Sequence, residues 1–311
     1  MQTRLHLCVW TQPKIMQFKK ITISDYSKIS EYFEIQPYQT CDFTNLGLYM
    51  WINYFNYEFA IDDETLFMRE NSEKGIKYFV PISKKHSLSE SLERLINDQG
   101  GCLGKLVLSA VPEILIREIE NHFNSTISLM RDWSDYIYNA QDLLLLQGKK
   151  YGKKRNLIHQ FINLYECSFE PIGESNIDKL IAFLERNNAI IDLSLASYEN
   201  RETIEVLKNY DKFNNLYGYV FYVNAEVIGF TICECRNDVC FIHVEKGSKE
   251  HKGSSQYIFW KTINEIFAKQ KFEYINREED VGDSGLRKAK MSYYPIKLLN
   301  KFEVEIDIKN S

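Results

Sequence analysis

The sequence has little glycine and proline, no long apolar run and no strong excess of one charge. Only 14 Gly and 6 Pro occur among 311 residues, which excludes collagen-like and low-complexity proteins. No run of about 18 uninterrupted apolar residues is present, so the sequence predicts no membrane-spanning helix. The net charge of −5 excludes a protein that coats nucleic acid over its whole surface. Any contact with a polyanion must therefore be local.

The cysteines show no pattern typical of disulfides or metal sites. They are odd in number and scattered, without a C-x-x-C pair or histidines at metal-ligand spacing. This predicts free, mostly buried thiols in a reducing cytoplasm, and no metal site. The seven are Cys8, Cys41, Cys102, Cys167, Cys233, Cys235 and Cys240.

The sequence does contain periodic apolar patterning over almost its whole length. With 44% hydrophobic residues the chain can bury at least one full core, and its length favours two domains. The order helix, helix, antiparallel strands, helix, strand occurs twice, which indicates an α/β chain and is compatible with an internal duplication. We expect domains over 16–134 and 135–311. Met16 reads as a more natural start than Met1, and the first fifteen residues as a loose tail.

The strongest β signal is a three-stranded antiparallel meander over 216–245. Asp132–Tyr138 before it reads as a hinge, and the last strand of the chain is expected over Ile296–Ile308. Further elements predicted in the second half are helices over Lys150–Tyr165, Asn176–Asn187, Ser197–Asn209, Ser255–Lys269 and Ser284–Tyr293, and strands over Ser168–Pro171 and Glu273–Arg277.

A basic segment, Lys149–Arg155, contains five cations among seven residues at the start of a predicted helix. Positive charge there opposes the helix dipole, and a bound anion would relieve the conflict. Lys150 and Lys154 share a stripe with apolar residues that must face the core, so these cations are expected to lean toward a cleft edge. A solvated, lysine-rich first turn explains the run equally well.

An acidic segment, Asn276–Asp283, follows a predicted strand and leads into a helix with Arg287, Lys288 and Lys290. Ligands bind at the carboxyl ends of strands in α/β sheets. Crowded carboxylates raise one another's pKa, which suits one of them for general-base work. Helix capping by Asp283 or Ser284, with ion pairing of the acids, is the simpler explanation.

A third candidate is the bend at Gly247–Gly253 between the meander and the next helix. Its small residues expose backbone N–H groups that can hold a pyrophosphate or another anion. His243 and Glu245 alternate onto one face of their strand and could line one pocket. A satisfied polar position on a half-buried strand is the commoner explanation for both.

Two long motifs resemble a known family. Asp135-Tyr136-Ile137-Tyr138 with the stretch Leu146–Asn156, and Asn276–Gly282 with Gly285–Pro295, are similar to soluble bacterial proteins related to the C-terminal domain of phosphatidylglycerol lysyltransferase. The resemblance covers roughly Ile21–Lys309. It implies two tandem acetyltransferase-type (GNAT-like) domains with mixed, mostly antiparallel sheets, and a more distant likeness to the Fem peptidyltransferases.

The resemblance also implies which residues border the donor and acceptor site. They are the two basic sets Lys150, Lys153, Lys154 and Arg155, and Arg287, Lys288 and Lys290. The chain departs from the pyrophosphate-binding pattern of acetyl-coenzyme-A-dependent members, because Glu250 and Ser255 occupy its outer positions and only Gly253 is in place. It also lacks the membrane portion of the lipid-modifying relatives, so a lipid acceptor is not implied.

These observations predict a cytoplasmic acyltransferase of aminoacyltransferase type. It would move an activated acyl group onto an amine or hydroxyl of a small molecule or peptide. Aminoacyl-tRNA is the expected donor, bound through the basic segments and Gly253. Glu245, Glu278 or Glu279 would accept the proton, backbone N–H groups near Val244–Lys246 would stabilise the oxyanion, and His243, Asn276 and Arg277 would line the pocket. The alternatives are an acetyl-coenzyme-A-dependent N-acetyltransferase and a non-catalytic member that senses a metabolite or binds RNA ends.

Overall fold

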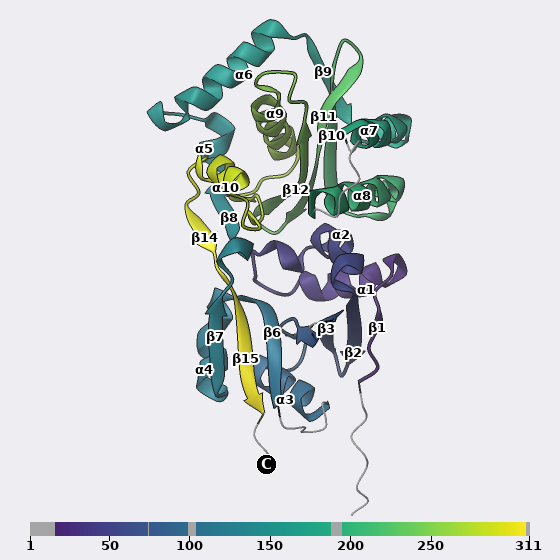
Figure 1. Ribbon diagram of the computed structural model, residues 1–311, viewed down its shortest axis with the longest axis vertical. Helices are drawn as coiled ribbons and strands as arrows, with labels where there is room; N and C mark the ends of the chain where they lie inside the picture. The colour runs from purple at the N-terminus through teal and green to yellow at the C-terminus, as the bar shows by residue number, and fades with distance from the viewer. Residues whose placement is uncertain (1–15, 74, 99–103, 188–194, 309–311) are drawn as a thin grey trace, which may run out of the picture.

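The computed structural model contains two mixed β-sheets, one in each half of an elongated molecule (Figure 1). It describes residues 16–73, 75–98, 104–187 and 195–308. The expected N-terminal tail, Cys8 and Cys102 lie outside these residues. The two sheets and their helices confirm the predicted α/β class with tandem GNAT-like domains.

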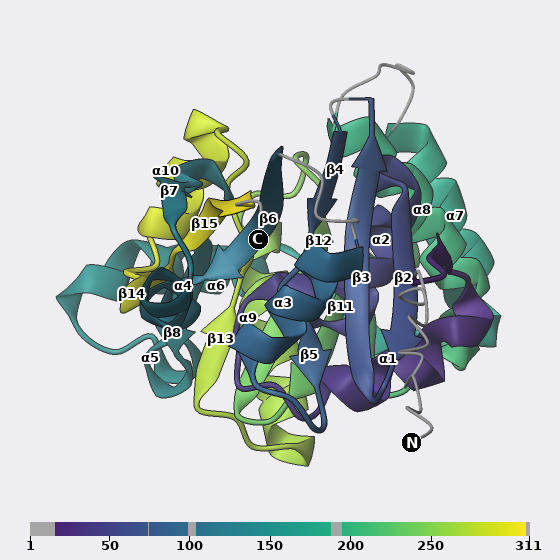
Figure 2. The ribbon, with the colours of Figure 1, turned by 90° about the horizontal axis from the view of Figure 1, so that it is seen from below.

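The first sheet has the strand order β1-β2-β3-β4-β6-β15-β7, with β5 paired to β3. Its strands are Lys19–Lys20 (β1), Tyr57–Asp62 (β2), Thr65–Ser72 (β3), Gly75–Tyr78 (β4), Ile82–Ser83 (β5), Gly104–Pro112 (β6), Ser125–Leu129 (β7) and Lys301–Ile308 (β15). Helix α3 (Leu88–Asp98) packs on the face turned away from the second half (Figures 1 and 2). The other helices of this half are Tyr26–Phe33 (α1), Asn45–Phe55 (α2) and Ile116–His122 (α4).

The second sheet has the order β14-β8-β13-β12-β11-β10-β9. Its strands are Asp135–Asn139 (β8), Cys167–Pro171 (β9), Leu216–Val223 (β10), Glu226–Arg236 (β11), Val239–Gly247 (β12), Tyr274–Asn276 (β13) and Lys297–Leu299 (β14). Strand β11 is buried from its second residue on, because helices cover both faces of the sheet. They are Ala140–Leu145 (α5), Gly152–Leu164 (α6) and Ser254–Lys269 (α9) on one face, and Glu174–Asn187 (α7) and Leu195–Lys208 (α8) on the other.

Helix α2 joins the two cores. Its residues Leu48 and Ile52 are buried in the core of the first sheet, whereas Leu46 and Met50 pack with α7 and α8 on the second. The helix lies between the halves (Figure 1). Thr44 caps its first turn by accepting a hydrogen bond from the Gly47 N–H at 3.2 Å. Helix α2 therefore packs into both cores, and its N-terminus is capped by Thr44.

The chain crosses between the halves twice, before β8 and between β14 and β15, and sequence patterning gave no sign of the second crossing. The predicted strand Ile296–Ile308 is two strands: β14 pairs with β8 in the second sheet, and β15 returns to the first sheet between β6 and β7. The predicted hinge is wrong as well, because its second part forms β8, a buried strand between β14 and β13. A hinge-like composition proved misleading, because the aromatic residues Tyr136 and Tyr138 are core side chains. The division at 134/135 stays a prediction, to which the structure adds the return of β15.

Candidate active site at the junction of the two halves

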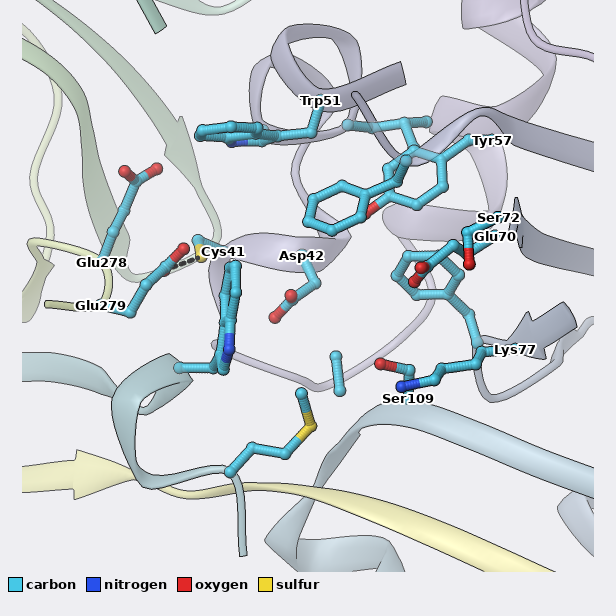
Figure 3. A pocket seen from close by; sticks show the side chains of 17 residues that line it. Cys41, Asp42, Trp51, Tyr57, Glu70, Ser72, Lys77, Ser109, Glu278 and Glu279 are labelled. Carbon is cyan, nitrogen blue, oxygen red and sulfur yellow. Dashed lines mark hydrogen bonds between the residues drawn. The ribbon is translucent and has the colours of Figure 1, made fainter. Parts of the chain in front are cut away.

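A cavity of about 320 Å³ lies where the two halves meet (Figure 3). One wall is the face of the first sheet that carries Tyr57, Glu70 and Lys77, which lie opposite one another on β2, β3 and β4. Helix α2 and the loop after β13 form other walls. The full lining is Cys41, Asp42, Gly47, Leu48, Trp51, Phe55, Tyr57, Glu70, Ser72, Lys77, Phe79, Ser109, Ala110, Met130, Trp133, Glu278 and Glu279.

The loop that brings Glu278 and Glu279 into the cavity has a strained backbone. Glu278 has φ = 56° and Val281 has φ = 45°, a region that β-branched residues avoid. The buried Lys290 side chain braces this loop, because its ammonium donates to the backbone carbonyls of Arg277 (2.5 Å) and Glu279. Strain of this kind persists where the surroundings impose it, and it clusters at functional sites.

Three carboxylates and one thiol surround a single buried lysine at the inner end of the cavity. The Lys301 Nζ lies 2.7 Å from an oxygen of Asp42, 2.7 Å from one of Asp135 and 3.8 Å from one of Glu279. The Cys41 thiol donates to Glu279 at 3.2 Å. Asp135 also accepts from the Cys41 N–H at 2.7 Å, and its side chain, like that of Lys301, is fully buried. The sequence brings these groups from four separate segments.

This cluster has more acid than base, which shifts its pKa values. Burial raises the pKa of Glu279 above its ordinary value, and the charges of Asp135 and Glu278 raise it further against the opposing effect of Lys301. Burial likewise raises the pKa of Asp42. A carboxyl group whose pKa is raised in this way is a better proton acceptor than an ordinary glutamate, as general acid–base catalysis requires.

Cys41, Asp135 and Glu279 also form the kind of group that could hold a metal ion, with ligand atoms within 4.8 Å of one another. Lys301 already contacts these groups, with its Nζ 3.4 Å from the Cys41 sulfur. Its ammonium supplies the positive charge that a cation would bring. The donor set is therefore better explained as an internal ion cluster.

His243 and Glu245 do not share a face, contrary to the alternation expected from the sequence. A β-bulge in β12 opposite Ile232 and Cys233 inserts His243 as an extra residue. His243 therefore contacts Glu278, with 2.7 Å between its Nδ1 and the carboxylate. Glu245 instead pairs with Arg277 at 2.7 Å. Of the three predicted proton acceptors, the structure brings Glu278 and Glu279 into the cavity, whereas Glu245 lines a different one.

The other two predicted pocket residues lie behind the cavity wall. The Arg277 guanidinium lies over the rings of Phe259 and Tyr293, with its carbon 4.2 and 4.8 Å from the two ring centroids. Arg277 comes directly after Asn276, the last residue of β13 that pairs with β12. The fully buried Asn276 donates to Asp135 at 2.8 Å. It also accepts from the Glu278 N–H at 2.6 Å. Both residues fix the position of the acidic loop.

The two basic segments predicted from the sequence lie side by side. Lys154 donates to the Ser292 hydroxyl at 2.7 Å, and the Tyr151 hydroxyl donates to the Tyr293 carbonyl at 3.2 Å. Burial, together with the Arg277 charge, lowers the pKa of Lys154 to about 8. The start of α6 and the end of Ser284–Met291 (α10) thus form one surface.

Only some of the predicted phosphate-binding cations remain available on this surface. Lys150 pairs with Asp142 at 2.8 Å, and Arg155 donates to backbone carbonyls of Leu146 and Gly148 near the end of α5. The acceptors of these contacts offset the positive charge at the start of α6, so no bound anion is needed to relieve its conflict with the helix dipole. Lys149, Lys153 and Lys288 are exposed, and their side chains form no hydrogen bond or ion pair with the described residues. The half-exposed Tyr294 ring contacts Tyr151, which lies just before α6. We call Lys149, Lys153, Lys288 and Tyr294 the basic surface.

Arg287 is only partly exposed and is already engaged by two carboxylates of the chain. Its guanidinium forms two hydrogen bonds to the buried Asp280, at 2.7 and 2.9 Å, and another to Asp132. Asp280 also accepts from the Tyr136 hydroxyl at 2.5 Å. Asp283 caps α10 through the Leu286 N–H, as the sequence indicated. Arg287 and Asp280 therefore anchor the acidic loop from its far end.

Replacing Asp280 by asparagine is expected to lower the free energy of unfolding by about 1–3 kcal/mol at neutral pH, because charged hydrogen bonds to a buried group are lost. Burial would raise the pKa of Asp280, but the bonds from Arg287, Tyr136 and Gly282 bring it well below its ordinary value. The ionised carboxylate thus stabilises the fold above its unfolded pKa, and this contribution disappears on acidification. Urea unfolding at pH 7 and pH 3 should show a smaller difference between the variant and the natural protein at pH 3.

Gly253 has a structural explanation. It has φ = +87°, and an added Cβ would collide with the Leu157 carbonyl of α6. A glycine is therefore required where α9 begins against α6. The bend itself lines a second cavity with Ser248, His251 and Ser255. Phosphate binding by Gly253 stays a prediction.

Sequence reasoning missed Asp42 and Trp51, which line the cavity, and Lys301, which pairs with Asp42. None of them carried a local motif, since each is one polar or aromatic residue within ordinary helical or strand patterning. Asp135 opened a motif that resembled the family, which was the only signal available for it. Cys41 was expected only as one of several free, mostly buried thiols, and it is free and buried.

The sequence profile described as "Phosphatidylglycerol lysyltransferase, C-terminal" matches residues 33–304. A conserved protein of unknown function from Bacteroides thetaiotaomicron VPI-5482 is 28% identical, with a TM-score of 0.85 over 94% of this chain and 100% of that one. L-PGS from Bacillus licheniformis is 14% identical in sequence, with a TM-score of 0.63 over 92% of each chain. FemX is 8% identical in sequence, with a TM-score of 0.58 over 93% of this chain and 97% of the FemX chain. Within the described residues, no helix is long and apolar enough to cross a membrane.

Proposed function

Because the chain belongs to the family of phosphatidylglycerol lysyltransferase C-terminal domains, we propose that it is an aminoacyltransferase that passes an aminoacyl group from a tRNA to an amine or hydroxyl acceptor. Family membership supports acyl transfer as the general chemistry. The observation that carries the finer proposal is the strained loop that points Glu278 and Glu279 into the junction cavity. Free buried thiols and a tRNA donor are consistent with a cytoplasmic protein.

In this reaction the protein aligns the ester of the donor with the nucleophile inside the cavity. For an amine acceptor, Glu278 binds the ammonium form, which loses one proton to solvent to become the neutral amine. Glu279 then takes a second proton from the nitrogen as it attacks the carbonyl carbon. The new C–N bond forms, the C–O bond to the ribose breaks, and the proton passes from Glu279 to the leaving ribose oxygen. A carboxyl group whose pKa is raised by burial suits both proton transfers.

The donor's phosphates would meet the basic surface. Its exposed lysines and its tyrosine ring offer the charge and the stacking platform that single-stranded RNA ends require. Helix α10 links the basic surface to the acidic loop. It carries Lys288 on its exposed side and Lys290, which braces the acidic loop, on its buried side. Binding there would place the 3′ end of a tRNA beside the loop.

Thermal unfolding tests this proposal against its alternatives. We expect a pool of aminoacyl-tRNA to raise the unfolding temperature at low salt and much less at high salt. A shift with coenzyme A or acetyl-coenzyme A, and none with tRNA, would favour the N-acetyltransferase. No response to any donor would favour a non-catalytic sensor.

The variant Lys153→Ala/Lys288→Ala is expected to weaken tRNA binding and to reduce the slope of log K against log salt by about 2, since each lysine lost removes about one phosphate contact. The matched control is Lys28→Ala/Lys212→Ala, which removes two exposed lysines from α1 and from the turn after α8. Filter binding at four salt concentrations measures both slopes. Equal slopes in the two variants would contradict the role of the basic surface.

A further inference from the structure

His243 lies between two carboxylates that belong to different parts of the junction. Its Nδ1 is 2.7 Å from Glu278, which lines the cavity, and its Nε2 is 3.6 Å from Glu234 on β11. The distance of 3.6 Å between Nε2 and Glu234 is too long for a hydrogen bond, and Nε2 has no hydrogen-bond partner among the described residues. The contact with Glu234 is therefore an ion pair. The His243 side chain is fully buried. Its ring is stacked on the Phe241 ring, with 6.1 Å between the two ring centroids.

Glu234 connects this histidine to the first half of the molecule. Its two oxygens accept from the backbone N–H groups of Asn45 (3.1 Å) and Leu46 (2.8 Å), the first two residues of α2. A carboxylate is favoured at a helix N-terminus by the free N–H groups and the helix dipole. The next turns of α2 carry Gly47, Leu48 and Trp51 into the cavity lining.

A continuous path of charge therefore runs from the α2 N-terminus through Glu234 and His243 to Glu278. It joins two walls of the cavity that come from opposite halves of the chain. The β-bulge at His243 is what turns the ring onto this path, a known use of bulges beside active sites. Nothing in the proposed reaction needs His243 to touch the substrate.

We propose that His243, as an imidazolium, is a positioning residue that holds the Glu278 carboxylate in the cavity and ties it to helix α2. This inference rests on the proposed aminoacyl transfer for its catalytic consequence, but the ion path is a property of the fold. Removing the positive charge would leave Glu234 and Glu278 without their shared partner and free the strained loop to shift.

The charged groups around the ring agree with this protonation state. Burial alone would lower the pKa of His243, but Glu234 and Glu278 outweigh it and raise the value to about 9. Burial would raise the pKa of Glu234, but His243 and the two α2 N–H groups hold it below its ordinary value. Other titratable groups also lie along this path. Cys235 on β11, whose thiol is neutral, and Tyr26 on α1 face Glu234, as does the buried Arg236 on β11. Glu279 and Lys290 lie near Glu278.

The experiment that tests the path itself is an NMR titration of the imidazole nitrogens, which needs no substrate. We expect the His243 ring to stay protonated up to about pH 9 in the natural protein and to lose its proton at a lower pH in Glu278→Gln and in Glu234→Gln. A ring that titrates near pH 6.5 and is unaffected by Glu278→Gln would overturn the inference.

Kinetics test the catalytic consequence. In His243→Gln we expect kcat to fall about 10- to 100-fold with little change in KM, and the alkaline limb near pH 9 to disappear from the pH profile. His159→Gln, which changes an exposed histidine on α6, is the control. An unchanged kcat and pH profile in His243→Gln would also overturn the inference. If the natural protein transfers no aminoacyl group from any donor, the proposed function fails, whereas the titration still decides the ion path.

Discussion

Glu279→Gln is expected to reduce the rate of aminoacyl transfer by about 10²- to 10⁴-fold, the usual effect of losing a general base. Glutamine keeps the size of the side chain and can still accept from the Cys41 thiol. It cannot take the proton of the nucleophile. Single-turnover transfer from labelled aminoacyl-tRNA measures the chemical step without the contribution of product release.

The pH dependence of the transfer rate in the natural protein is a second test of Glu279 as the proton acceptor. A proton acceptor works only when ionised, so the rate should rise with pH through the pKa of Glu279. Since burial raises that pKa, the rise should occur above the ordinary range of a glutamate. In Glu279→Gln the remaining activity should lack this acid limb.

Stability separates a catalytic effect from misfolding. The cluster holds Asp42, Asp135 and Glu279 around one lysine, so removing one acid relieves a desolvated charge. Glu279→Gln should therefore unfold at the same or a higher temperature. Glu120→Gln, at an exposed position of α4, is the matched control and should alter neither property. Full transfer activity in Glu279→Gln would refute its assignment as the base.

The other large effect is expected from Lys301→Met, which should lower the free energy of unfolding by about 3–5 kcal/mol. Methionine preserves the length and apolar stem of the side chain but leaves Asp42 and Asp135, each 2.7 Å from the lost ammonium, without their cation. Breaking a buried ion pair from one side is costly because an uncompensated charge remains. Urea unfolding at pH 7 measures the difference.

Lys297→Met is the control for this variant, since Lys297 is exposed on β14, four residues earlier in the chain. Its effect should remain within about 0.5 kcal/mol. The double variant Lys301→Met/Asp135→Asn should recover part of the loss, because it removes one of the stranded charges. A loss below about 1 kcal/mol in Lys301→Met would show that the cluster does not hold the halves together.

Local patterning determined much of the second half. The meander was predicted within a few residues, because its strands are apolar and its turns carry residues that tolerate positive φ, such as Asn224 and Asn237. Asp283 as the α10 cap followed from the same local logic. These features depend on interactions between near neighbours in the chain, which a sequence records directly.

The acidic pair Glu278 and Glu279 was also identified from the sequence, because it follows a strand. What the sequence could not supply was the other side of the cavity. Tyr57, Glu70 and Lys77 lie about 200 residues earlier in the chain, on strands whose local pattern is ordinary. No local signal records that two surfaces will face each other after folding.

By itself, then, the sequence determined the α/β class, the main strands and the two charged segments, since these follow from residue type and short-range spacing. Only the tertiary structure decided which charges are available. It turned Lys290 inward, paired Arg287 with the buried Asp280, placed His243 in a bulge between two acids, and sent β15 back so that Lys301 meets Asp42 and Asp135. The physical reason is that burial and partner charges, which fix the role of an ionisable group, come from segments far apart in the chain.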